Sequence, residues 1–416
     1  MSGNGLNVMP RLRDLSFKGP GMMAIKADTT ISTAMSCGDK RVLVVSVSAG
    51  SGHVRAADAL CAHALHGFSD LSLRHRDMMR FVPSWFKKIY TDFYLKLASG
   101  LPEVWGWLYR TTDQQPINRP VDRLRRLIQR LCSQALFAEI GRYAPDAIIC
   151  THFLPAELLA DALGRGQLNI PVWVVVTDFD VHQMWVHPNV TGYFVANEEL
   201  SYRLQTAGIP ESKIMVTGIP VMPEFTQSLQ RDQCRVKWTL DPNRVTLLMM
   251  SGGAGMGMSS MLIQSLLNID ASLQLIILTG RNQRLFEELN TLACFCGGRL
   301  LPVPFTERVA ELMTCADLVI TKPGGLSTSE CLVMGLPMLL IQPVPGQEER
   351  NAALLLQEGV AQRADDKATL LYRLRRLLSD THLLSTMRSR TQSLAQPHAA
   401  RLILQHVKQT LTKAAF

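Results

Sequence analysis

The feature that most constrains this chain is a series of short, continuously apolar runs separated by helical stretches. The first run, residues 42–48, breaks into a turn with two glycines that ends at His53, and a helical pattern then extends to His66. Runs without polar alternation indicate strands that are buried on both faces, as in parallel sheets covered by helices. The same pattern recurs in the first half of the chain at residues 146–151, 172–177, 193–196 and 214–217.

The pattern restarts after a segment with two prolines and a glycine at residues 218–223, where we place a linker. An apolar run at 245–250 leads into a glycine-rich turn at 251–257 and then a helix, which repeats the opening of the first half. We therefore predict an α/β fold with two Rossmann-like domains and a cleft between them, because ligands of such sheets bind at the carboxyl ends of the strands. Further strands of the second domain are predicted at residues 273–278, 300–303, 317–321 and 337–341.

Four segments follow from this pattern. We expect a flexible tail over residues 1–40, one Rossmann-like domain over 41–220, a second over 221–364, and basic helices over 365–416. The stretch at 81–130 breaks the alternation, because aromatic side chains are interleaved there with basic ones. It is either a helical subdomain with a largely aromatic core or a segment that rests on a membrane surface.

The charge balance is basic, with 43 Lys and Arg against 35 Asp and Glu and a formal net charge of +8. A basic chain favours an anionic partner, such as nucleic acid, a membrane surface or a phosphorylated substrate. The excess lies in residues 74–130 and 365–416 rather than around the glycine turns, and no nucleic-acid recognition module is evident, so we expect no nucleic-acid partner. Apolar residues make up 47% of the chain, which excludes a mainly disordered protein.

The cellular compartment is indicated by the cysteines and by the apolar runs. The chain has nine cysteines and no CxxC pair, which is typical of a reducing compartment without disulfide bonds. No apolar run reaches the roughly 18–20 residues that span a bilayer, and residues 1–40 lack the pattern of a signal peptide. We therefore expect a cytoplasmic protein.

The first glycine turn carries a candidate catalytic group. Ser48-Ala-Gly-Ser-Gly-His53 links a predicted strand to a predicted helix. Glycine allows close backbone approach, and a helix N-terminus favours an anion. His53 would stand at the mouth of the cleft, where a histidine can take a proton near neutral pH. The alternative is a histidine that only caps the helix or lies exposed.

The second glycine turn, at residues 251–257, has the spacing of a phosphate-binding loop. Similar spacing occurs in nicotinamide sites, but those need an acidic residue at the end of the second strand. Here that strand ends in Leu278-Thr-Gly-Arg281-Asn282, without an acid. We therefore predict phosphate binding, with Arg281 suited to a diphosphate or a ribose phosphate.

The most specific motif is Thr321-Lys-Pro-Gly-Gly-Leu-Ser-Thr-Ser-Glu330, a strand end, a double-glycine turn and a helix. Amides at a helix N-terminus can hold a diphosphate, and Glu330 could accept hydrogen bonds from both ribose hydroxyls. The alternative is a capping box over residues 327–330. After the next strand, Gln347 and Glu348 could bind sugar hydroxyls.

A fourth motif, residues 176–185, follows a predicted strand and places Asp178, His182 and Trp185 at the cleft. Asp178 and His182 also resemble metal ligands. No third ligand is evident, so we predict no metal site.

Together these motifs resemble those of glycosyltransferases of the GT-B type, most closely the monogalactosyldiacylglycerol synthases and processive diacylglycerol glucosyltransferases. The resemblance covers roughly residues 41–360 and is carried by SAGxGHxxAA from Ser48, VTDFxxHxxW from Val176, GIPVxPxF from Gly218 and TKPGGLSxxE…GLPxxL…PGQExxNA from Thr321. The last pattern is also similar to that of the lipid-linked N-acetylglucosaminyltransferase of peptidoglycan synthesis.

The resemblance implies inverting transfer of galactose or glucose from UDP-galactose or UDP-glucose to diacylglycerol, with no cofactor and no metal. It implies His53 as the general base. The donor-binding residues that it implies are Gly255, Met256, Arg281, Phe305, Gly325, Leu326, Glu330, Gln347 and Glu348. The acceptor-side residues are Asp178, His182 and Trp185. It further implies a peripheral protein on the inner face of the cell membrane, in contact with anionic lipids.

Three alternatives stay open. The acceptor could be another lipid, such as a lipid-linked sugar. UDP-N-acetylglucosamine 2-epimerases share the fold and need no lipid. A non-catalytic UDP-sugar-binding protein would bind nucleotide without turnover.

Overall fold

The computed structural model describes residues 39–48, 50–82, 134–250 and 259–413. Residues from Ala34 to Phe416 form one compact unit. Within the described ranges, no helix is both long enough and apolar enough to cross a membrane. The predicted tail and most of the aromatic and basic stretch at 81–130 lie outside the described residues, so both predictions stay untested.

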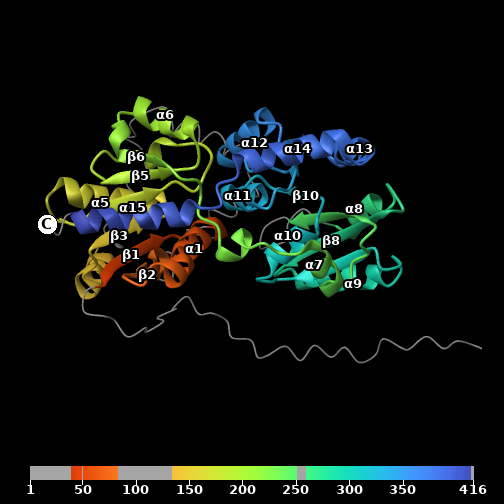
Figure 1. Cartoon of the computed structure of the whole chain (residues 1–416), viewed down its shortest axis with the longest axis horizontal. Helices are drawn as coiled ribbons and strands as arrows, with labels where there is room; N and C mark the ends of the chain where they lie inside the picture. The colour runs from red at the N-terminus through yellow and green to blue at the C-terminus, as the bar shows by residue number, and fades with distance from the viewer. Residues whose placement is uncertain (1–38, 49, 83–133, 251–258, 414–416) are drawn as a thin grey trace, which may run out of the picture. The chain divides into compact units, whose positions relative to one another are not determined.

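The first sheet is parallel and has six strands in the order β2-β1-β3-β4-β5-β6 (Figure 1). Its central strands are buried at almost every position, which is the physical basis of the continuous apolar runs in the sequence. The strand bounds are β1 Lys40–Ser46, β2 Leu71–Asp77, β3 Ala147–Cys150, β4 Val172–Val175, β5 Gly192–Val195 and β6 Ile214–Val216.

The second sheet is also parallel, with the order β12-β11-β10-β7-β8-β9. Strand order runs outward in both directions from the β7–β10 pair, as in a Rossmann sheet. The strand bounds are β7 Val245–Met250, β8 Leu273–Gly280, β9 Leu300–Pro304, β10 Leu318–Thr321, β11 Met338–Ile341 and β12 Ala361–Ala364. The predicted fold of two Rossmann-like domains is therefore confirmed.

Helices connect successive strands, as parallel pairing requires. The first sheet has α1 Ser51–Gly67, α5 Phe153–Gly164 and α6 Glu198–Thr206. The second has α8 Ser260–Leu267, α9 Gln283–Ala293, α10 Val309–Cys315, α11 Gly325–Val333, α12 Gln347–Gln357 and α13 Lys367–Ser379. The connection from β6 to β7 contains the short helices η4 Pro223–Thr226 and α7 Arg231–Lys237.

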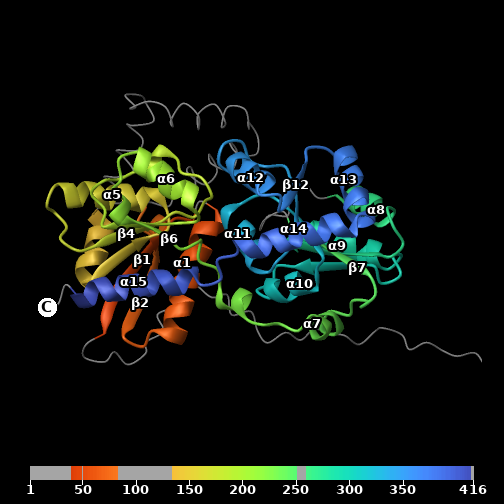
Figure 2. The same ribbon diagram turned by 45° about the horizontal axis from the view of Figure 1, so that its top comes forward.

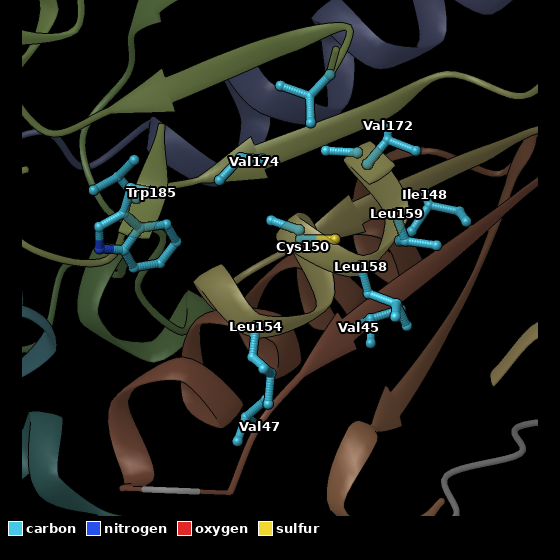
Figure 3. Packing of buried hydrophobic residues seen from close by; sticks show 14 of the residues in the cluster. Val45, Val47, Ile148, Cys150, Leu154, Leu158, Leu159, Val172, Val174 and Trp185 are labelled. Carbon is cyan, nitrogen blue, oxygen red and sulfur yellow. The ribbon is translucent and has the colours of Figure 1, made fainter. Parts of the chain in front are cut away.

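Each sheet has an apolar core on both faces. On one face of the first sheet, side chains from β1, β3, β4 and α5 pack together, with Trp185 at one side of the group (Figure 3). The matching cores of the second sheet contain residues such as Leu248 and Val319 on one face and Leu247 and Ile320 on the other. Both faces are therefore covered, as the sequence predicted.

The C-terminal helices divide between the two sheets. Helix α14, Thr381–Leu394, contributes Met387 to a core of the second sheet. Helix α15, Ala399–Lys413, returns to the first sheet, where Ile403, Leu404 and Val407 pack beside β1 and β3 (Figures 1 and 2). The apolar face of α15 is thus already buried against protein. The domain boundaries drawn from the sequence stay a prediction.

Candidate active site

Both sheets change strand order at one place, between β1 and β3 in the first and between β7 and β10 in the second. Loops that leave neighbouring strands at such a point diverge to opposite faces and leave a crevice at the carboxyl ends. In the first sheet these loops lead to His53 and His152. In the second sheet the described loop is residues 322–324, while residues 251–258, which follow β7 in the sequence, lie outside the described residues. The candidate site is built on these loops.

His53 lies in the first turn of α1, where Gly50, with φ 116°, makes the turn out of β1. Its Nδ1 lies 3.0 Å from the carbonyl oxygen of Thr151 and 2.7 Å from the hydroxyl oxygen of Thr177. A carbonyl can only accept, so Nδ1 carries the proton and Nε2 keeps its lone pair. Burial lowers the pKa of His53 to about 4, despite the hydrogen bond to Thr151, so the ring is neutral at pH 7.

A second histidine packs on the first. His152 caps α5 by accepting a hydrogen bond at Nδ1 from the amide of Leu154, at 3.0 Å. Its ring meets that of His53 edge to face, with centroids 4.5 Å apart, and Trp185 lies 6.3 Å from His53. Burial holds the pKa of His152 well below its usual range, with a smaller contribution from His53. Two neutral imidazoles and an indole therefore form one wall of the site.

Helix α11 supplies the opposite wall. It begins at Gly325 after an N-cap glycine, Gly324, and no side chain caps it. The capping box considered at residues 327–330 is therefore wrong, because Ser327 is already inside the helix. The uncapped amide groups of the first turn have the geometry that binds anions. Leu326, the second residue, packs against cores of both sheets.

Glu330 lies in the second turn of α11 and is 8% exposed. Burial raises the pKa of its carboxyl group to about 7, although Arg55 on α1 lowers it in part. Within the described part of the chain, no hydrogen bond reaches this carboxyl group. A buried carboxylate without hydrogen-bond donors is unfavourable, so its position suits a ligand that supplies hydroxyl groups.

The loop after β4 meets helix α12 at Asp178. The side chains of Gln347 and Asn351 lower the pKa of this carboxyl group, but burial outweighs them and raises it to about 7. Its Oδ2 is buried and has no hydrogen-bond partner among the described residues. Asn351 also accepts from the amide of Phe179 and donates to the carbonyl of Pro323, both at 3.0 Å. Asn351 therefore joins the acceptor-side loop to the turn before α11.

Glu348, the second residue of α12, accepts a hydrogen bond from the amide of Val344 at 2.7 Å. Burial raises the pKa of its carboxyl group, and Lys322 lowers it in part. Its Oε1 lies 3.8 Å from the position that a Cβ on Gly324 would take. Glu348, near the start of α12, thus lies close to Gly324, the N-cap residue of α11. The sugar-binding role of Gln347 and Glu348 stays a prediction.

Two of the residues that the sequence predicts to bind the donor lie together at the ends of β8 and β9. The guanidinium of Arg281 lies over the ring of Phe305, 5.6 Å from its centroid, and the ring is 59% exposed. An exposed aromatic face beside a cation suits a planar base with an attached phosphate. Gly255 and Met256 lie outside the described residues.

The acceptor-side loop is held by ion pairs. Asp180 pairs with Arg350 of α12 at 2.6 Å and with Arg203 of α6 at 3.4 Å. His182 begins the short helix that carries Trp185 and caps it by accepting from the amide of Met184. Beside them is an open cavity of about 490 Å³, lined in part by His182, Arg203 and Arg350.

Several residues of this site were not found from the sequence. Thr151 and Thr177 orient His53, His152 packs on it, and Asn351 joins the two walls. A signal was present for each, since Thr151 and Thr177 end predicted strands, His152 follows one, and Asn351 belongs to the PGQExxNA pattern. Within the described ranges, no three His, Cys, Asp or Glu side chains gather so as to hold a metal ion.

Comparison with known proteins gives two matching family models. Residues 53–221 match the model described as monogalactosyldiacylglycerol (MGDG) synthase, and residues 190–408 match the one described as UDP-N-acetylglucosamine 2-epimerase. The chain is 29% identical over 370 residues to the processive diacylglycerol beta-glucosyltransferase of Bacillus subtilis (strain 168), covering 89% of this chain and 95% of that protein. The protein of the same name from Bacillus cereus (strain G9842) is 32% identical over 257 residues, covering 62% of this chain and 66% of that protein.

Solved structures share the fold. S. aureus MnaA in complex with UDP has a TM-score of 0.60 at 13% identity, covering 90% of this chain and 97% of that chain. Acinetobacter baumannii MurG has a TM-score of 0.58 at 16% identity, and the match covers 89% of this chain and 99% of that chain. UDP-GlcNAc 2-epimerase from Neisseria meningitidis, bound to UDP-GlcNAc, has a TM-score of 0.59 at 13% identity, covering 89% and 100%.

Two parallel Rossmann-like sheets with a site at their carboxyl ends define a protein of the GT-B class. The second half of the chain carries the pattern of the UDP-N-acetylglucosamine 2-epimerases, whose model matches just over half of the chain, so the chain belongs to that wider group. Within the class, it belongs to the family of the monogalactosyldiacylglycerol synthases and processive diacylglycerol glucosyltransferases.

Proposed function

We propose that this protein transfers a hexose, which we take to be glucose, from a UDP-sugar to diacylglycerol and so makes a glycolipid. The observation that carries the proposal is the meeting of the two walls, where Asn351 of α12 accepts a hydrogen bond from the amide of Phe179, in the loop after β4, at 3.0 Å. A group on the first wall can thereby reach a sugar held at the start of α12. The relatives are named processive diacylglycerol beta-glucosyltransferases, and we take the acceptor diacylglycerol and the hexose glucose from these names.

In the proposed reaction, Nε2 of His53 takes the proton of the acceptor hydroxyl as its oxygen attacks the anomeric carbon. The bond from that carbon to the UDP oxygen breaks, and the configuration inverts. In the protein without substrate, the low pKa of His53 keeps its Nε2 unprotonated. A bound diphosphate would raise this pKa by Coulomb attraction and so strengthen the base when substrate is present.

On the donor side, the departing UDP gains negative charge. We assign the amide groups at the start of α11, near Gly325 and Leu326, to the diphosphate, together with Arg281. Glu330 would accept hydrogen bonds from the ribose hydroxyls, and Phe305 would stack on uracil. Gln347 and Glu348 would bind the hexose. With charge stabilised by fixed dipoles and a guanidinium, transfer would need no metal.

We also propose that the protein works at a membrane surface, on the cytoplasmic side, with anionic lipids as partners. The basic excess at residues 74–130 and 365–416 supports this. In the second segment part of the charge is paired within the protein, as between Lys408 and Asp70 at 2.6 Å. The outer faces of the helices would therefore make the contact, since the apolar face of α15 is buried.

The test is product analysis. The full chain is incubated with labelled UDP-glucose or UDP-galactose and with vesicles that contain or lack diacylglycerol, and lipids are separated by thin-layer chromatography. We expect labelled glycolipid and UDP release only with diacylglycerol and mainly from UDP-glucose. UDP release or isomerised UDP-sugar without lipid would instead support an epimerase. Preference for UDP-galactose would correct the hexose alone, and binding without turnover would overturn the proposal.

A further inference from the structure

A cavity of about 400 Å³ lies apart from the candidate active site and shares no residue with it. It is lined by η4 and the chain after it, the C-terminal ends of α10 and α11, and α14 with the turn that follows it. We call it the crossover pocket and define it by Gln227, Arg231, Arg388 and Gln392, which are four of its lining residues.

The crossover pocket is lined by hydrogen-bond donors and by positive charge. Arg231 and Arg388 line it, and Gln227, Ser228 and Gln392 add amide and hydroxyl groups. No aspartate or glutamate is among its lining residues. This differs from the cavity beside His182, where Glu199 is part of the lining and both arginines are paired with Asp180.

Arg231 and Arg388 are both held in place by Asp317, which is not one of the lining residues. Asp317 accepts a hydrogen bond from Arg231 at 2.5 Å, while its backbone carbonyl accepts one from Arg388 at 3.1 Å. The same carboxylate also pairs with the buried Arg235, at 3.1 Å. One negative charge thus faces three guanidinium groups, and Asp317 itself does not line the pocket.

The arginines keep donors for a ligand. Each guanidinium carries five N–H groups, and the structure shows one hydrogen bond each for Arg231 and Arg388. The N–H groups of Arg235, by contrast, already donate hydrogen bonds to Thr246 and to backbone carbonyl groups. Burial lowers the pKa of Arg388, Arg231 adds to this effect and Asp317 opposes it, and an anion in the pocket would further stabilise the charged guanidinium.

The pocket also lies where the chain crosses between the sheets. The described chain passes from the first sheet to the second between β6 and β7, and returns between α14 and α15. Both crossings line the pocket, through Gln227 and Pro397. They also touch each other, because a Cβ at Gly218 would collide with the side chain of Gln396. A ligand here would contact both connections between the sheets.

We propose that the crossover pocket binds a small soluble anion through a phosphoryl group, either free phosphate or a phosphomonoester. Planar guanidinium groups recognise phosphoryl oxygens through paired N–H donors, and the neutral amides can complete the shell. The volume leaves room for an organic group attached to the phosphate. The inference does not depend on the transfer reaction, because no residue is shared with the active site.

The test is calorimetric titration of the full chain with inorganic phosphate and, separately, with glycerol phosphate, in saturating UDP so that the donor site is filled. Sodium chloride of equal ionic strength is the control ligand. We expect binding of one or both anions, weakened at least tenfold in the Arg231→Gln/Arg388→Gln variant. Arg390→Gln removes one positive charge from the exposed face of α14, and Arg390→Gln/Arg401→Gln removes two from exposed positions, as the pocket variant does; both should bind as wild type.

The two anions distinguish the sources of the phosphoryl group. Tighter binding of glycerol phosphate means that the organic part is recognised, whereas equal binding means that the phosphoryl group suffices. If the double variant fails to fold, Gln392→Glu tests the same pocket by adding a carboxylate, and we again expect at least tenfold weaker binding. No binding to wild type, or equal binding to wild type and pocket variants, would overturn the proposal.

Discussion

Gly325, the first residue of α11, packs directly on the carbonyl group of Thr177, in the loop after β4. A Cβ at Gly325 would collide with that carbonyl oxygen and would lie 3.2 Å from Oδ1 of Asp178. Only glycine permits this approach. The contact brings the uncapped start of α11 against the loop after β4, whose Thr177 contacts His53.

Substitution Gly325→Ala should therefore separate the two walls. A displacement of about 1 Å in an active site can lower turnover by about 100-fold, and we expect a loss of that order in glycolipid formation. Gly324→Ala is the matched control, because its Cβ would meet only Glu348, at an ordinary 3.8 Å. Equal rates for the two variants would show that this contact does not position the site.

Substitution Glu330→Gln should weaken UDP binding and, above neutral pH, raise the stability of the folded protein. The folded protein raises the pKa of Glu330 from 4.5 to about 7, so between these pH values the native state holds a proton that the unfolded state has lost. The free energy of unfolding therefore falls as pH rises through this window, by on the order of 3 kcal/mol. Glutamine carries no proton that can be lost, so the free energy of unfolding of the variant should not fall in this way as the pH rises.

We expect Glu330→Gln to unfold at a higher temperature than wild type at pH 8, with a smaller difference at pH 4.5. At the same time it should bind UDP at least tenfold more weakly, since an amide accepts from two ribose hydroxyls less well than a carboxylate. Glu287→Gln, on the exposed face of α9, should change neither property. Unchanged UDP affinity in Glu330→Gln would remove Glu330 from the ribose site.

Asn351→Ala should weaken the connection between the walls. The buried amide makes hydrogen bonds to Phe179 and Pro323, and the alanine leaves the amide of Phe179 and the carbonyl of Pro323 without these partners. We expect a loss of about 2–3 kcal/mol in the free energy of unfolding, measured by urea denaturation. Gln357→Ala, exposed on the same helix, should be within about 0.5 kcal/mol of wild type.

The two sheets could be predicted from the sequence because their central strands are buried on both faces and read as apolar runs. The edge strands β2 and β12 were missed for the same physical reason. Strand β2 carries Arg74, His75 and Arg76, and β12 carries Gln362 and Arg363, so neither has the continuous apolar pattern that the edge strands β6 and β9 keep.

The position of a residue in the fold was predictable where a motif fixed its element, as for Glu330 in α11, while its binding role stays a prediction. The arrangement was not predictable where tertiary contacts decide. The proton on Nδ1 of His53 depends on Thr151, which lies 98 residues away in the chain. The return of α15 to the first sheet likewise depends on packing, since its apolar face alone does not determine which sheet it packs against.

Removal of divalent metal should leave transfer unchanged. In the proposed reaction the leaving group is stabilised by helix amides and by Arg281, and these do not depend on an ion. We expect the rate of UDP release with diacylglycerol to be equal, within about twofold, in EDTA and in added magnesium. A loss in EDTA that magnesium restores would show that a metal takes part.

The most direct measurement of the central claim is the rate of transfer from labelled UDP-glucose to diacylglycerol by His53→Ala, beside UDP affinity by calorimetry. Loss of a general base costs about 10²- to 10⁴-fold, so we expect a fall in that range with UDP affinity within about twofold of wild type. Turnover at the wild-type rate would contradict the role of His53 and, with it, the proposed mechanism.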